Sequence, residues 1–186
     1  MDKVNWNELR DRAYQNAVKH GWYDEESMLH HLMMFVTELG EVVNADRIGK
    51  SADRIEFDKI FEMPSQDPKF HFSFCYEAFI KDTLEDELAD AAIRLLSLAG
   101  FKKYDIDSSS FTEKSFKELS VGFKPHRVTE ILYSFLIIMI DKKRTLSDLL
   151  YCIIALAHHL QIDLLWHIEQ KMKYNEMRPF KHGKKY

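Results

Sequence analysis

Residues 85–100 read EDELADAAIRLLSLAG, and they carry a clear helical pattern. Thr83 and Asp86 stand at the spacing of a helix capping box, and Gly100 is a typical helix stop. Between them the apolar residues recur at helical intervals, with no alternation of the strand type. The stretch therefore predicts a long helix with one apolar face.

A second helix of the same kind is predicted over residues 24–47, with Asp24 as its cap and a stop near Gly49. Its apolar positions follow helical spacing: Met28, Leu29, Leu32, Phe35, Val36, Leu39, Val42 and Val43. Each of the two helices needs a partner to cover its apolar face, which favours a bundle.

The rest of the chain adds further helices, predicted over residues 5–20, 125–140, 145–160 and 163–177. The chain has only six glycines and four prolines, so few residues favour turns. No segment shows the alternation of apolar and polar residues that is typical of a strand. We therefore expect a single all-α domain over residues 1–186, a helical bundle of about five to six helices. The stretch 48–82 predicts an irregular insertion in which residues 51–62 can form a short helix. Residues 105–120 predict a loop with room for one helical turn, and 179–186 a basic tail.

Composition favours a cytoplasmic protein. The net charge of −4 is unlike that of a general nucleic-acid binder, so no nucleic acid is expected as a partner. Cys75 and Cys152 make no disulfide framework and are expected to be reduced thiols. The start MDKVNWNELR has no apolar signal-peptide core, and the apolar stretches 131–140 and 149–160 are too short to span a bilayer. No membrane is therefore expected as a partner.

Two acidic pairs occupy matching places on the two long helices. Glu38 and Glu41 are three residues apart, as are Glu87 and Asp90, so each pair projects from one side of its helix. Measured from each apolar face, the two pairs lie at nearly the same angles. If the helices pack antiparallel, the four carboxylates converge and need a cation among them. Oxygen ligands alone suit Mg²⁺, with Mn²⁺ also possible.

Two alternatives remain open at this point. A single acidic pair at this spacing is typical of a solvated helix face, and either pair can be no more than that. A di-iron bundle is the other alternative, but it usually needs Glu-x-x-His ligands on two helices. This sequence has no Glu-x-x-His, so magnesium is favoured over iron.

The last helix offers partners for phosphate. Lys171, Asn175 and Arg178 are spaced four and three residues apart and share a face if the helix reaches Arg178. Lysine and arginine are natural ligands of phosphate oxygens, and an asparagine can donate to a phosphate, sugar or base. The same residues also fit a solvated helix end, where basic side chains favour the helix dipole.

The chain resembles the MazG-like nucleoside triphosphate pyrophosphohydrolases of the all-α pyrophosphatase superfamily. The likeness rests on TELGEVVNA at 37–45, EDELADAAIRLLSLAG at 85–100 and KMKYNEMRPFKHGKKY at 171–186. The first two hold the family's metal motif, Glu-x-x-Glu followed by Glu-x-x-Asp. The segment between them is longer than is usual in the family, so 48–82 is the insertion.

The resemblance implies a reaction, in which an NTP or dNTP and water give NMP and pyrophosphate with Mg²⁺. It assigns Glu38, Glu41, Glu87 and Asp90 to the metal, and one of the glutamates, Glu38 or Glu41, to the attacking water. Lys171 and Arg178 would grip phosphates, and Asn175 would contact the nucleotide. Family members are commonly dimers or dimer-based tetramers, so we expect a homo-oligomer through the apolar helices at 125–140 and 145–160. A catalytically silent nucleotide-sensing module is the alternative.

Overall fold

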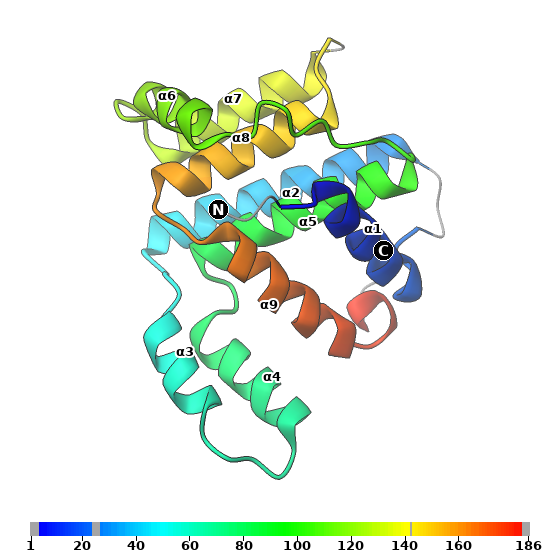
Figure 1. Ribbon diagram of the computed structural model, residues 1–186, viewed down its shortest axis with the longest axis vertical. Coiled ribbons are helices and arrows are strands. Elements are labelled where there is room, and N and C mark those ends of the chain that lie inside the picture. The colour runs from blue at the N-terminus through cyan, green and yellow to red at the C-terminus, as the bar shows by residue number, and fades with distance from the viewer. Residues whose placement is uncertain (1–3, 24–26, 142, 184–186) are drawn as a thin grey trace.

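The computed structural model describes residues 4–23, 27–141 and 143–183 (Figure 1). Over these residues the chain forms nine α-helices and no strand, which confirms the all-α class. The helices are α1 (Trp6–Lys19), α2 (Met28–Ile48), α3 (Arg54–Phe61), α4 (Pro68–Phe79), α5 (Leu84–Phe101), α6 (Glu113–Phe123), α7 (Val128–Ile140), α8 (Leu146–His159) and α9 (Leu164–Met177), followed by a short 3₁₀ turn at Phe180–Gly183.

The expected count of five to six helices is wrong, mainly because the insertion is helical. Asp53 caps α3, where its side chain accepts from the Glu56 N–H at 3.0 Å. Asp67 caps α4 in the same way, and Pro68 stands in its first turn. Proline is tolerated there because that N–H has no helical partner anyway. The prolines therefore mark the ends of helices in a segment that we expected to be irregular.

Residues 105–120 also differ from the expected loop, because α6 begins at Glu113. Its capping box pairs Thr112 with Ser115 in place of the usual acidic partner. The other predicted helices form close to their expected bounds. Ser27 caps α2 through its side chain, and the expected cap Asp24 lies outside the described residues.

Helix α5 lies at the centre of the structure (Figure 1). It packs against α1, α2, α8 and α9, and most of its residues are buried. On the α1 side the two backbones approach closely at Gly100, where an added Cβ would lie 2.5 Å from the Cβ of Tyr14. Any larger residue at 100 would therefore push α1 away. The central position of α5 matters because this helix presents Glu87 and Asp90.

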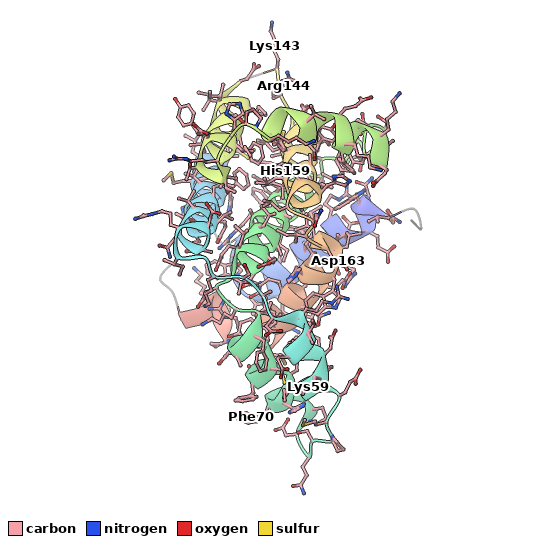
Figure 2. The ribbon with its side chains drawn as sticks, turned by 90° about the vertical axis from the view of Figure 1, so that its left-hand side faces the viewer. Lys59, Phe70, Lys143, Arg144, His159 and Asp163 are labelled. Atoms are coloured by element: carbon pink, nitrogen blue, oxygen red, sulfur yellow. The ribbon has the colours of Figure 1, made fainter. Side chains whose placement is uncertain are left out.

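The hairpin of α3 and α4 forms a separate lobe beside the main core. Figure 2 shows Lys59 and Phe70 near the far end of this lobe, with Lys143 and Arg144 at the opposite end of the molecule. A small aromatic cluster under the hairpin includes Phe57, Phe72 and Tyr76 and reaches Tyr174 on α9. The hairpin is thus packed against the helix that bears Lys171.

Over the described ranges no single helix is both long and apolar enough to cross a bilayer. Helices α8 and α9 pass that test only when they are taken together, and the pair is bent by 113°.

Candidate metal centre

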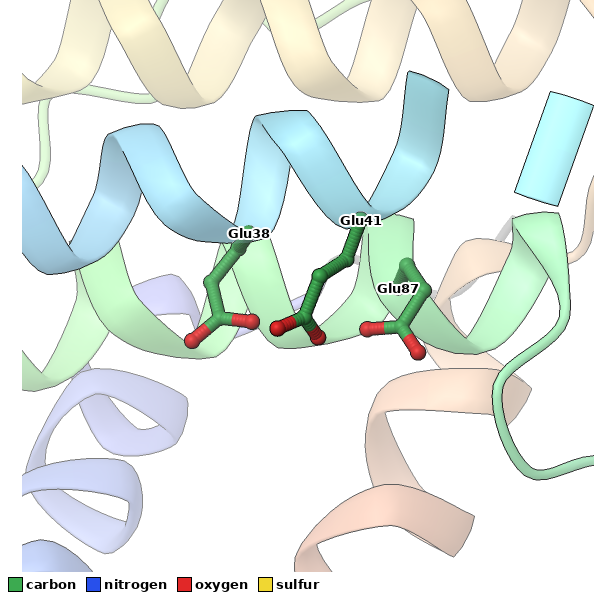
Figure 3. A group of neighbouring side chains, drawn as sticks. All are labelled: Glu38, Glu41 and Glu87. Atoms are coloured by element: carbon green, nitrogen blue, oxygen red, sulfur yellow. The ribbon is translucent and has the colours of Figure 1, made fainter. Parts of the chain in front are cut away.

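Three of the four predicted carboxylates meet between α2 and α5. Oxygens of Glu38, Glu41 and Glu87 lie within 4.8 Å of one another, and Figure 3 shows the three side chains pointing to the same side. The helices run antiparallel, because Glu41 lies near Glu87 while Glu38 pairs with Arg94, two turns further along α5. The predicted convergence therefore occurs for these three residues.

Glu87 is the least exposed of the three carboxylates. Its side chain is only 4% exposed, and its Oε2 has no hydrogen-bond partner in the part of the chain that the structure describes. Burial raises the pKa of Glu87 to about 9, with Asp90 and Asp86 adding to the shift and Lys171 opposing it. A buried carboxylate oxygen without a partner is costly, and a cation is the ligand that relieves this cost.

Glu38 is buried as well, but one of its oxygens is engaged. Oε1 accepts from Nε of Arg94 at 2.9 Å, and the Arg94 guanidinium lies 5.3 Å from the ring centre of Trp22. Burial raises the pKa of Glu38 to about 7, and Asp90 adds to the rise while Arg94 reduces it. Glu41, by contrast, is exposed, and Figure 3 shows it between Glu38 and Glu87.

Asp90 is placed differently from its predicted companions. Its Oδ2 lies 2.8 Å from the Nζ of Lys171, and the three-carboxylate group does not include it. Burial alone would raise the pKa of Asp90, but Lys171 and Arg94 outweigh burial and lower it. Asp90 still lies close enough to Glu38 and Glu87 to raise the pKa of both.

Lys171 was expected to grip phosphate, but the structure turns it toward carboxylates. Its side chain is almost wholly buried, and Nζ also lies 2.9 Å from Asp86 Oδ2. Sequence reasoning assigned Asp86 to capping alone, yet its carboxylate is fully buried beneath α9. The run of three acidic residues at 85–87 was a signal for the burial of one of them. Consecutive residues point to different sides of a helix, so they cannot all face solvent when other helices enclose it.

Asn175 and Arg178 line one cavity of about 600 Å³ together with all four predicted carboxylates and Lys171. Oδ1 of Asn175 is buried without a hydrogen-bond partner among the described residues. Lys50 and Lys81 line the same cavity and add positive charge to its wall. In the predicted basic tail, Lys181 donates its backbone N–H to the His20 carbonyl, while Lys184 and Lys185 lie outside the described residues.

The donor set fits a hard divalent cation. The three converging side chains offer only carboxylate oxygens, without histidine or cysteine, which favours Mg²⁺ or Mn²⁺ over zinc or iron. Two cations form ion pairs with these acids: Arg94, whose side chain is 25% exposed, pairs with Glu38, and buried Lys171 pairs with Asp86 and Asp90. No ion pair engages Glu41 or Glu87 among the described residues.

Comparisons of the chain with protein-family models, with curated proteins and with solved structures find no match. The all-α class is therefore what the structure confirms, and the MazG-like resemblance stays a prediction from the motifs.

Proposed function

We propose that this chain is a Mg²⁺-dependent nucleoside triphosphate pyrophosphohydrolase of the MazG-like kind. The observation that carries the proposal is the buried Oε2 of Glu87, which has no hydrogen-bond partner among the described residues and belongs to a three-carboxylate group on a 600 Å³ cavity. The same cavity has Asn175 and Arg178 on its wall, so a cation and a polyphosphate can share it.

Each residue has a proposed part in the reaction. Glu38, Glu41 and Glu87 hold the cation, and Asp90 stands beside them. Glu41, being exposed, is the carboxylate best placed to orient a water molecule and take its proton. Arg178 binds phosphate oxygens and Asn175 contacts the nucleotide. The bound cation would offset the charge that develops on the phosphate oxygens.

The bond changes follow from this assignment. The water oxygen bonds to the α-phosphorus while the bond from that phosphorus to the bridging oxygen breaks. Pyrophosphate leaves with the electron pair of the broken bond, and the water proton passes to the carboxylate. The products are a nucleoside monophosphate and pyrophosphate.

The test is a panel of ribo- and deoxynucleoside triphosphates incubated with Mg²⁺, with pyrophosphate and orthophosphate measured separately. We expect pyrophosphate and monophosphate from the wild type, and loss of turnover in Glu38→Gln and in Glu87→Gln. Glu85→Gln is the matched control, because it makes the same change on α5 at a side chain that accepts from the Ala52 N–H. Release of orthophosphate instead would refute the assigned bond cleavage.

A catalytically silent nucleotide-sensing module is the second candidate. The observation that favours it is the contact of Asp90 with Lys171, which leaves three carboxylates in the group where the motif has four. Such a protein would bind a nucleotide with Mg²⁺, as measured by calorimetry, and turn over none in the panel.

The expected homodimer or dimer-based tetramer is likewise a proposal. Helix α7 exposes Tyr133, Ile137 and Ile140 at the spacing of one helix face. This apolar face supports α7 as part of an interface between two copies of the chain. Helix α8, the other helix proposed for the interface, is largely buried within the chain. Light scattering of the purified protein, compared between wild type and Ile137→Lys, tests this assignment.

A further inference from the structure

Tyr76 joins the hairpin of α3 and α4 to Asp86, the residue next to Glu87 of the candidate metal centre. This residue on α4 is wholly buried and stacks on Tyr174 of α9, with ring centres 4.4 Å apart. Its hydroxyl donates a hydrogen bond to Oδ1 of Asp86 on α5. The inserted segment is therefore joined to both helices that supply the buried charges.

Asp86 has no exposure, and both of its oxygens are engaged. Oδ1 accepts from Tyr76, while Oδ2 accepts from the Asp82 N–H at 3.0 Å and from Nζ of Lys171 at 2.9 Å. Asp86 also belongs to a second acidic group, with Asp82 and Glu87, whose oxygens lie within 4.8 Å of one another, but the three bonds that it accepts leave it little capacity to bind a cation. Its strongest partner is the Lys171 ammonium, so Asp86 acts first of all as a counter-ion.

Lys171 lies between two carboxylates one helical turn apart, Asp86 and Asp90. If Asp86 carried no charge, Asp90 alone would balance the buried ammonium. The negative charge of Asp90 would then be balanced by Lys171 and would no longer attract a cation beside Glu87. With Asp86 charged, the three side chains together keep one net negative charge for that cation.

We propose that Asp86 and Tyr76 are positioning residues of the cation site: Asp86 neutralises Lys171, and Tyr76 holds Asp86 in place, so that the charge of Asp90 stays available to the cation. The inference rests on the cation site of the proposed function, and it needs no nucleotide. It gives the inserted hairpin a part in cation binding, through the hydroxyl of Tyr76.

The experiment is a titration of the purified full chain with Mn²⁺ alone, followed by calorimetry and by electron paramagnetic resonance of the free ion. Asp86→Asn keeps the shape of the side chain but removes its charge. We expect it to weaken Mn²⁺ binding by about 10- to 100-fold, the usual effect of losing a partner that orients a ligand. Tyr76→Phe keeps the ring and its stacking, and we expect a smaller loss in the same direction.

Glu77→Gln is the matched control, because Glu77 is an exposed acid on the same hairpin that accepts from the Tyr174 hydroxyl at 2.7 Å. Glutamine can still accept that bond, so Mn²⁺ affinity should stay at the wild-type value. A loss in Glu77→Gln as large as that in Asp86→Asn would overturn the proposal, since any acidic residue near the site would then have the same effect.

The double variant Asp86→Asn with Lys171→Met separates the counter-ion role from a merely structural one. Methionine has a similar length without the charge, and an apolar side chain can replace a buried ion without loss of the fold. If Asp86 acts by neutralising Lys171, the double variant recovers most of the Mn²⁺ affinity that Asp86→Asn loses. An equal or greater loss in the double variant would refute the proposal.

The outcomes distinguish this inference from the proposed reaction. Mn²⁺ binding that depends on Asp86, in a protein that turns over no nucleotide, supports the inference and refutes the enzyme. Turnover with unchanged Mn²⁺ affinity in Asp86→Asn and in Tyr76→Phe refutes the inference and leaves the enzyme. Circular dichroism melts of each variant report whether it folds, and Tyr76→Phe serves as the test if Asp86→Asn does not.

Discussion

Replacing Glu87 by glutamine should make the cation-free protein more stable near pH 7. The reason is that the folded chain buries this carboxyl group, which raises its pKa from the ordinary 4.5 to about 9. A carboxyl group whose pKa is raised by folding stabilises the folded state most fully below pH 4.5, and that stability is lost as the pH rises toward 9. Glutamine takes up no proton and loses nothing over this range.

The size of the effect follows from the same shift. About 2.5 pH units separate the ordinary pKa from pH 7, and each unit corresponds to about 1.4 kcal/mol, so the variant should gain about 3 kcal/mol. Near pH 4 the difference should vanish, because the carboxyl group is then largely protonated in both states.

The assay is urea unfolding in the presence of a chelator near pH 4 and near pH 7, for the wild type, Glu87→Gln and the control Glu85→Gln. Added Mg²⁺ should then stabilise the wild type, since a ligand that binds only the folded state raises its stability, and should leave Glu87→Gln unchanged. A variant that is less stable than the wild type near pH 7 would refute the reasoning. The carboxyl group of Glu87 would then stabilise the folded state at that pH, whereas we expect it to lower the free energy of unfolding.

Two further predictions concern the fold. Gly100→Ala should destabilise the chain by about 1–3 kcal/mol in thermal unfolding, because its Cβ would meet Tyr14 at 2.5 Å. Gly122→Ala on α6, with no heavy atom within 4 Å of the new Cβ, should instead add up to about 1 kcal/mol, and losses of equal size would contradict the close approach. Burial lowers the pKa of His167 to about 4, so the wild type should lose up to about 3 kcal/mol as the pH falls from 6.5 to 4 and the unfolded chain takes up the proton. His167→Gln should lose less over that range in urea unfolding, and parallel curves for the two proteins would show that His167 is not buried in its neutral form.

The long helices were predictable because their signals are local. Thr83 and Thr145 accept from the backbone N–H three residues ahead, as the capping pattern requires. The meeting of Glu38, Glu41 and Glu87 was predictable for a similar reason, since equal angles on two packed helices bring side chains together.

The parts that sequence reasoning missed depend on contacts between distant segments. The run 85–87 indicates that one of its acids is buried, but it does not identify Lys171, 85 residues away, as the partner of Asp86. The pairing of Arg94 with Glu38 depends in the same way on how α2 and α5 align. The first helix of the hairpin, α3, lies within the short helix allowed at 51–62, but α4 was missed. Prolines break a helix interior, whereas here Pro68 begins α4 and Pro64 lies between the two helices.

The enclosure of α5 has a consequence for how the chain folds during synthesis. Among the described helices its neighbours include α1, which precedes it by more than sixty residues, and α9, which follows it by about the same distance, so these contacts join segments far apart along the chain. A nascent chain that has not yet released α9 from the ribosome holds Asp86 and Asp90 without Lys171, and burying both charges unpaired is strongly unfavourable. We therefore expect the interior around α5, with the three-carboxylate group beside it, to close only after α9 has emerged.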